Sequence, residues 1–201
     1  AAQAVPLDTL YPTIAARPSF TSCADLPQTY IDAVIAVEDS RFVYHHGVDP
    51  VAILRAIGTD LRTRSLAEGG STITQQLAKN ALFTQEKHFA RKAAEMFAAL
   101  DLEKHYSKQE IFEMYANTIY FGNGCYGIAE AAQGYFGKTP AQLTAAECVV
   151  LAGLPKAPSI YASSPEKMAA RANVVLRRMG ECKKLTEQQA AEVAAELDGL
   201  W

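Results

Sequence analysis

The chain has 201 residues, of which 49% are hydrophobic and 20% are charged. This balance excludes a disordered polypeptide and fits one domain with an apolar core. The formal net charge of −3 excludes a nucleic-acid-binding protein that relies on overall positive charge, so any basic site must be local. No stretch approaches the roughly 18–20 apolar residues that a membrane-spanning helix needs.

The first part of the chain is predicted to be irregular and then helical. Residues 1–24 contain three prolines and are expected to form an irregular N-terminal segment. Helices are expected to open at Asp25-Leu26-Pro27 and at Asp49-Pro50, because proline is tolerated in the first helical turn. A third helix, TITQQLAKNALF, follows Gly69-Gly70-Ser71.

The remainder of the chain is also predicted to be helical. A long helix is expected from Thr84 to Tyr106, and the segment EIFEMYANTIY is expected to continue as a helix until just before Gly122. Further helices are predicted over AECVVLAGL, over about 165–178, and at the C-terminus. Capping boxes are predicted for three pairs: Ser107 with Glu110, Thr144 with Glu147, and Thr186 with Gln189. Since alternating strand patterns are scarce, the fold class is all-α.

The four cysteines are scattered without a CxxC pair, which argues against a zinc site or a dense disulfide framework. Cys148 lies in an apolar run and is interpreted as a core residue. One disulfide bridge between two of the other three cysteines remains an open alternative.

Five clusters carry the chemistry. They are EDSRF (38–42) with His45 and Gly47; GGSTITQQLAKN (69–80); Arg91-Lys92 with Glu95, Leu102-Glu103 and Ser107-Lys108; YFGNG (120–124) with Gly127-Ile128 and Ala131-Ala132; and LAGLP (151–155) with Ala157-Pro158. In this order and spacing they resemble the five motifs of the peptidoglycan glycosyltransferases (glycosyltransferase family 51). That family includes monofunctional enzymes and the N-terminal domains of bifunctional penicillin-binding proteins. The resemblance covers about residues 28–180.

The resemblance implies a mostly α fold, with a lysozyme-like helical head and a smaller membrane-proximal jaw at about 48–68, within one glycosyltransferase domain. It also implies polymerisation of lipid II and the growing glycan chain, with inversion and release of polyprenyl pyrophosphate. The expected place is the extracytoplasmic face of a bacterial membrane, with an N-terminal transmembrane anchor that this chain lacks. Cell-wall synthesis proteins are candidate partners, and nucleic acid is not.

Two glutamates are the candidate catalytic residues by position in these motifs. Glu38 suits the base that deprotonates the acceptor hydroxyl. Glu95 shares a helix with Arg91 and Lys92 and suits the orientation of those cations or assistance to the leaving group. A departing pyrophosphate needs fixed positive charge, for which Lys79, Arg91 and Lys92 are the candidates.

The same motifs and the predicted jaw also contain other candidate substrate-binding residues. Gly70 and Ser71 allow the backbone to approach an anion at a helix N-terminus. The remaining candidates are Asp39, Arg55, Gln75, Gln76 and Asn80, and some of the three amides must instead pack, because they point to opposite helix faces. His45 is interpreted as a packing or hydrogen-bonding residue, and no metal-ligand set is expected. No cofactor is required, although Mg²⁺ or Mn²⁺ could accompany the pyrophosphate.

The segment VAILRAIGTDL is amphipathic, with five apolar residues beside three arginines: Val51, Ile53, Leu54, Ile57 and Leu61, with Arg55, Arg62 and Arg64. It suits an anionic membrane surface, and the alternative is a core helix of a soluble protein. Two other functions stay open. One is a lysozyme-like muramidase or lytic transglycosylase, whose sugar leaving group needs no such cations. The other is a non-catalytic scaffold that binds lipid II.

Overall fold

The fold is mostly helical, as predicted. The computed structural model describes residues 6–63, 70–83 and 89–201, and the side chains of residues 57–63 and 89–91 lie outside this description. The α-helices are α1 (Leu7–Ala15), α2 (Gln28–Glu38), α3 (Pro50–Thr63), α4 (Ile73–Leu82), α5 (Phe89–His105), α6 (Lys108–Ala116), α7 (Ile128–Phe136), α8 (Ala145–Gly153), α9 (Pro158–Ala162), α10 (Pro165–Glu181) and α11 (Glu187–Asp198). The short elements are the 3-10 helices η1 (Cys23–Asp25), η2 (Pro140–Gln142) and η3 (Leu154–Lys156), and the antiparallel strands β1 (Tyr120–Gly122) and β2 (Cys125–Tyr126).

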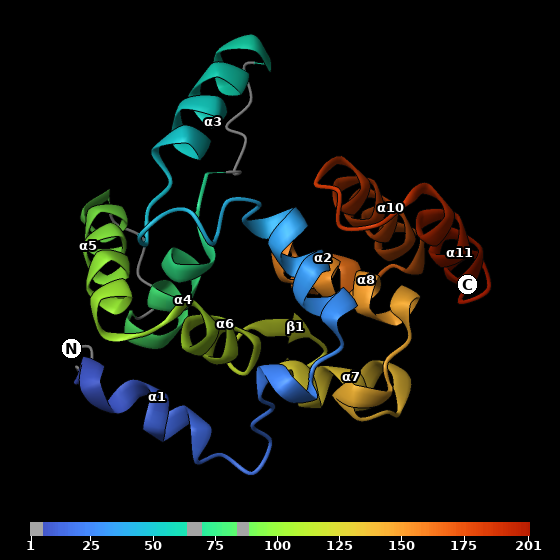
Figure 1. Cartoon of the computed structure of the whole chain (residues 1–201), viewed down its shortest axis with the longest axis horizontal. Helices are drawn as coiled ribbons and strands as arrows, with labels where there is room; N and C mark the ends of the chain where they lie inside the picture. The colour runs from blue at the N-terminus through green and yellow to red at the C-terminus, as the bar shows by residue number, and fades with distance from the viewer. Residues whose placement is uncertain (1–5, 64–69, 84–88) are drawn as a thin grey trace.

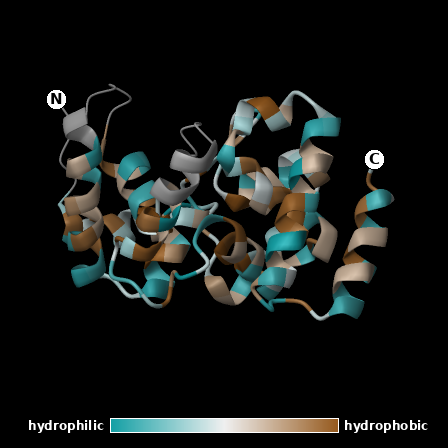
Figure 2. Cartoon of the chain, turned by 90° about the horizontal axis from the view of Figure 1, so that it is seen from above, coloured by the Kyte–Doolittle hydropathy of each residue, from teal (hydrophilic) through white to brown (hydrophobic). Residues whose placement is uncertain are grey.

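The centre of the fold is α8, whose residues from Ala146 to Gly153 are all buried. α2 and α10 pack on α8 and on each other, and α11 packs on both α8 and α10. α4, α5 and α6 form a second group (Figure 1). Figure 1 also shows α3 projecting away from the other helices. Apolar and polar residues alternate along the helices, as expected where each helix buries one face (Figure 2).

The three predicted capping boxes are confirmed at the starts of α6, α8 and α11. A fourth, between Thr72 and Gln75, opens α4. Each box satisfies two backbone N–H groups that the first turn of a helix leaves without partners. Cys148 is buried as predicted, and all four cysteines are free thiols.

The prediction that residues 1–24 are irregular is wrong. α1 forms despite Pro12 in its interior, because Leu10 and Ile14 become buried. Its Tyr11 hydroxyl donates to Glu113 Oε2 at 2.6 Å, and Tyr11 N donates to the Tyr106 hydroxyl at 3.2 Å. These tertiary contacts, with α6 and with the residue that follows α5, outweigh the local cost of proline.

The helix predicted over EIFEMYANTIY also ends earlier than expected. α6 stops at Ala116, and residues 120–126 form the β1–β2 hairpin. Asn117 ends the helix because its side chain bonds the backbone of Thr21 in both directions, at 2.8 Å each. Gly122 and Gly127 then adopt positive φ, where an added Cβ would lie 2.7 Å from another residue. These two positions therefore require glycine for the shape of the backbone.

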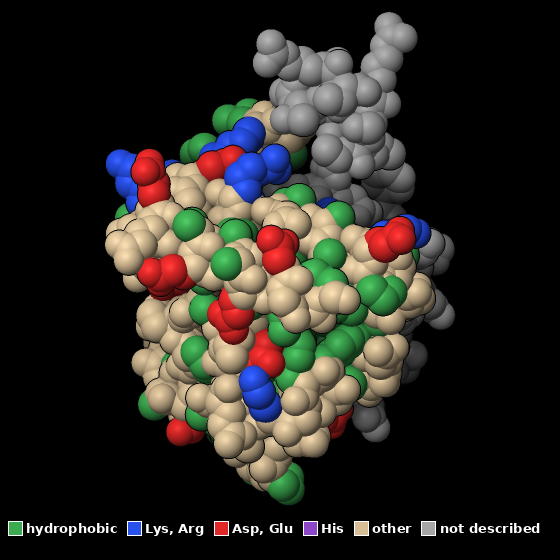
Figure 3. All heavy atoms as spheres, turned by 90° about the vertical axis from the view of Figure 1, so that its right-hand side faces the viewer, with side chains coloured by type: hydrophobic (Ala, Val, Ile, Leu, Met, Phe, Trp, Pro, Cys, Tyr) green, Lys and Arg blue, Asp and Glu red, His purple; other side chains and the backbone are tan. Residues whose placement is uncertain are grey.

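Charge is distributed unevenly over the surface. On the face that α10 and α11 form, most Lys and Arg side chains lie near one edge, while acidic side chains are spread below it (Figure 3). In the described part of the chain, no helix combines the length and apolar character that crossing a membrane would require.

Candidate active site

Glu38 is the last residue of α2, and its side chain is only 8% exposed. Each carboxylate oxygen has its own donor. Arg171 Nη2 from α10 donates to Oε1 at 3.3 Å, and Gln76 Nε2 from α4 donates to Oε2 at 2.8 Å. The carboxylate is thus oriented by two elements far from α2 in sequence.

Asp39 follows immediately but has a different environment. Its carboxylate is buried, accepts the backbone N–H of Ile73 at 3.0 Å, and contacts His45 Nε2 at 2.9 Å. These contacts tie the end of α2 to the start of α4. The interpretation of His45 as a hydrogen-bonding residue is confirmed, and Asp39 is engaged mainly in this internal network.

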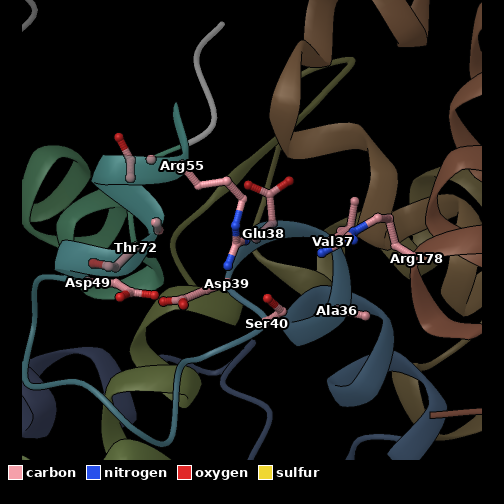
Figure 4. Close-up of a pocket in the computed structure, with 12 residues that line it drawn as sticks. Ala36, Val37, Glu38, Asp39, Ser40, Asp49, Arg55, Thr72 and Arg178 are labelled. Atoms are coloured by element: carbon pink, nitrogen blue, oxygen red, sulfur yellow. The ribbon is translucent and has the colours of Figure 1, made fainter. Parts of the chain in front are cut away.

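A polar pocket with a volume of about 70 Å³ lies beside Glu38. Its lining comes from the end of α2, the start of α3, the segment before α4, and α10: Ala36, Val37, Glu38, Asp39, Ser40, Asp49, Ala52, Arg55, Gly70, Ser71, Thr72 and Arg178. Figure 4 shows Arg55 extending from α3 toward Glu38 and Asp39, with Arg178 approaching from the opposite side. Four of the predicted substrate-binding residues (Asp39, Arg55, Gly70 and Ser71) therefore share this pocket with Glu38.

Glu95 connects to the same pocket through Lys92. Lys92 Nζ lies 3.4 Å from Glu95 Oε2 and donates to Ser71 Oγ at 2.9 Å. The Glu95 side chain is 4% exposed, whereas that of Lys92 is 54% exposed. A buried carboxylate thus orients an accessible ammonium at the edge of the pocket.

Of the remaining predicted site residues, one contacts Glu38 and others do not. Gln76 contacts Glu38, but Gln75 is buried, and its Oε1 accepts the Thr72 N–H at 3.0 Å as part of the α4 cap. Gln75 is therefore a structural residue, in line with the expectation that some of these amides pack. Lys79 and Asn80 are exposed on α4, and Lys79 forms no ion pair with another described residue. The side chain of Arg91 lies outside the described residues.

The predicted jaw corresponds to α3 and exposes apolar side chains. Val51 is 45% exposed and Leu54 is 70% exposed, while Ile53 is half-buried. The side chains of Ile57 and Leu61 lie outside the described residues, as do Arg64 and the rest of 64–68.

Sequence reasoning missed Arg178, which lines the pocket, and Arg171, which contacts Glu38. Arg171 lies 133 positions from Glu38, outside the five motifs. One signal was present: Arg171 falls on the face of α10 that also carries the buried Val175 and Met179. A cation at a helix position that packing should make apolar indicates a buried partner.

The described residues do not by themselves form a metal centre. Nowhere in ranges 6–63, 70–83 and 89–201 do three or more described His, Cys, Asp or Glu side chains gather as ligands. Glu95, one of the two candidate catalytic carboxylates, has the ammonium group of Lys92 as its neighbour.

Comparison with known proteins identifies the family of the chain. The family model described as Transglycosylase matches residues 7–180. Penicillin-binding protein 1A of Haemophilus influenzae is 47% identical over 170 residues, which cover 83% of this chain and 20% of that protein. Penicillin-binding protein 1A of Escherichia coli is 47% identical over 85% of this chain and 20% of its own length, and penicillin-binding protein 1F of Bacillus subtilis is 42% identical over 89% and 25%.

A solved structure shares the architecture. The crystal structure of penicillin-binding protein 1A from Haemophilus influenzae aligns with a TM-score of 0.50 and 27% identity, over 87% of this chain and 17% of that one. The chain thus spans about a fifth to a quarter of the length of these curated relatives. The chain belongs to the transglycosylase family and is a peptidoglycan glycosyltransferase domain.

Proposed function

We propose that this domain polymerises lipid II into glycan strands by inverting glycosyl transfer and releases polyprenyl pyrophosphate. The observation that carries the proposal is the Glu38 carboxylate, which two donors orient beside a pocket with arginine in its lining. A single in-line displacement at an α-linked sugar pyrophosphate needs a base for the attacking hydroxyl and stabilisation of the departing anion.

In this proposal Glu38 is the base. An ionised carboxylate has about four lone-pair positions, and the Arg171 and Gln76 contacts use two of them. The others remain for the acceptor sugar hydroxyl. Because the side chain is 8% exposed, little water competes with that hydroxyl for the carboxylate.

The leaving group is assigned to the other side of the pocket. Lys92 would meet the pyrophosphate, and Glu95 and Ser71 hold its ammonium in place. Gly70 and Ser71 add backbone close to the ligand. A lytic enzyme, whose leaving group is a sugar, would gain nothing from this ammonium, so the site favours the synthetic reaction. The described residues alone form no ligand cluster that would hold the Mg²⁺ or Mn²⁺ that could accompany the pyrophosphate.

We place the reaction at the extracytoplasmic membrane surface, with α3 as the contact to lipid. Val51 and Leu54 expose apolar area on a helix that also carries Arg55. An amphipathic helix of this kind suits an anionic interface. Lipid II and the growing strand would reach Glu38 from that side.

The test is Glu38→Gln. The amide is nearly isosteric but cannot accept the proton, and a positioned base contributes about 10²–10⁴-fold. We expect polymer formation from lipid II to fall by at least that factor, with the fold and lipid II binding largely intact. The matched control is Glu166→Gln, an exposed carboxylate at the start of α10. Near wild-type turnover of Glu38→Gln would remove Glu38 from the mechanism.

A further inference from the structure

We propose that Arg171 is a positioning residue for Glu38, which holds the carboxylate in place and aimed at the pocket during glycosyl transfer. The inference rests on the proposed function, since it assumes that Glu38 is the base. It adds a residue of α10, outside the five motifs, to the machinery of the reaction.

Arg171 is itself firmly held. Its Nε donates to the carbonyl oxygen of Gly153 at 3.2 Å, and its side chain is 14% exposed. A Cβ added to Gly153 would lie 3.0 Å from Arg171 Cγ, so the aliphatic stem runs tightly against the C-terminal end of α8. With the stem and Nε immobilised, the guanidinium has little freedom except to meet Glu38.

The Glu38 carboxylate requires such a partner. A carboxylate that is largely removed from water loses hydration, and a cation in direct contact compensates for that loss and fixes the direction of the carboxylate. Gln76 provides a hydrogen bond but no charge. The buried hydroxyls of Tyr30 and Tyr115 are uncharged, because burial raises the pKa of both groups above the ordinary value of 10.0.

Other arginines near the pocket have partners of their own. Arg178 is bound to Glu181, and Arg41 Nε lies 3.1 Å from Asp49 Oδ2. Arg55 reaches toward the pocket from α3 and is exposed. Arg171 is a largely shielded cation, 14% exposed, that contacts Glu38 directly at 3.3 Å.

The experiment is a double-mutant cycle on turnover of lipid II. Arg171→Gln and Arg171→Lys are each made in the wild-type and the Glu38→Gln backgrounds. The matched control is Arg177→Gln on the same helix, whose side chain is 69% exposed. In the wild-type background we expect Arg171→Gln to lower kcat by roughly 10²-fold with KM changed less than about threefold, because misplacing a catalytic group by about 1 Å has that effect.

Arg171→Lys should restore part of kcat, because it returns the charge without the planar fork. In the Glu38→Gln background, Arg171→Gln should cause no further loss of the residual turnover. A residue that only stabilises the fold would lower turnover equally in both backgrounds, and this result would overturn the inference. An unchanged kcat in Arg171→Gln would overturn it as well.

Thermal unfolding of the same variants gives a readout without activity. Arg171→Gln should lower the Tm of the wild-type chain clearly more than that of Glu38→Gln, since only the former leaves a buried carboxylate without its cation. Equal Tm losses would show that the two side chains are not coupled and would overturn the inference. Absence of polymer from the wild-type chain, by contrast, would defeat the proposed function itself, and the Tm cycle would still decide on the pairing.

Discussion

At the scale of single residues, the two catalytic candidates differ in the charge of their neighbours and in their access to the pocket. Glu38 lines the pocket and is oriented by Arg171 and Gln76. The Glu95 side chain is buried and lies against Lys92. A carboxylate that faces an accessible ammonium is suited to holding that cation, and one that faces the pocket is suited to accepting a proton.

Lys92→Ala tests this division at the residue scale. We expect binding of a pyrophosphate-mimicking ligand, such as moenomycin, to weaken roughly tenfold, because a charge-assisted hydrogen bond contributes about 1.5 kcal/mol or more. Calorimetric titration would measure the change. Lys104→Ala is the matched control, since Lys104 lies on the same helix and is paired with Asp101 at 2.7 Å. Equal affinity in the Lys92 variant and the control would remove Lys92 from the anion site.

At the scale of elements, the site depends on close contact between the loop after α2 and helix α5. Gly47 has φ +87°, and a Cβ there would lie 2.6 Å from the carbonyl oxygen of Ala99. Thr72 Oγ1 donates to the Gly47 carbonyl at 2.6 Å, which brings the start of α4 to the same point. Three segments that carry Glu38, Ser71 and Glu95 thus meet around one glycine.

Gly47→Ala is predicted to destabilise the domain by about 2 kcal/mol or more, because it adds a backbone clash to the strain of positive φ. Gly137→Ala is the comparison: its φ is +65°, but nothing lies within 4 Å of an added Cβ, so only the strain, about 1 kcal/mol, applies. Urea unfolding of both variants measures the difference. If Gly47→Ala proved no worse than Gly137→Ala, the close contact with α5 would be unimportant for stability.

At the scale of the whole molecule, α3 projects from the other helices and carries Val51 and Leu54 at 45% and 70% exposure (Figure 1). Exposed apolar side chains on a protruding amphipathic helix are unfavourable unless a partner covers them. The proposed partner is the membrane, which also holds the lipid substrate. The geometry would place the pocket between this helix and the body formed by α2, α8 and α10.

Leu54→Ser should weaken binding to vesicles of phosphatidylglycerol and phosphatidylcholine roughly tenfold, because burying a leucine side chain contributes about 1.5 kcal/mol or more. Co-sedimentation measures the bound fraction. Ile160→Ser, on α9, changes an apolar side chain of 52% exposure elsewhere and should leave binding unaltered. Equal losses for both substitutions would indicate non-specific adsorption and contradict the role of α3.

The sequence by itself determined most helices and the candidate carboxylates. Helix starts could be predicted because capping boxes such as Ser107 with Glu110 are local, and their hydrogen bonds join residues three apart. Glu38 and Glu95 could be predicted because they stand in motifs with characteristic residues around them. α1 was missed because its stability comes from Tyr11 and the buried Leu10 and Ile14, which contact helices about 100 residues away.

Only the tertiary structure decided how the residues of the motifs share their tasks. Gln75 and Gln76 are adjacent in sequence, yet one caps α4 and the other contacts Glu38, because successive helix residues point in directions about 100° apart. Arg171 could not be assigned to Glu38 from sequence, since their contact depends on the packing of α10 against α2 and α8. Local hydrogen bonds and hydrophobic periodicity depend on residues close together in sequence and can be predicted from it. Ion pairs between distant helices form only when the helices pack into the folded core.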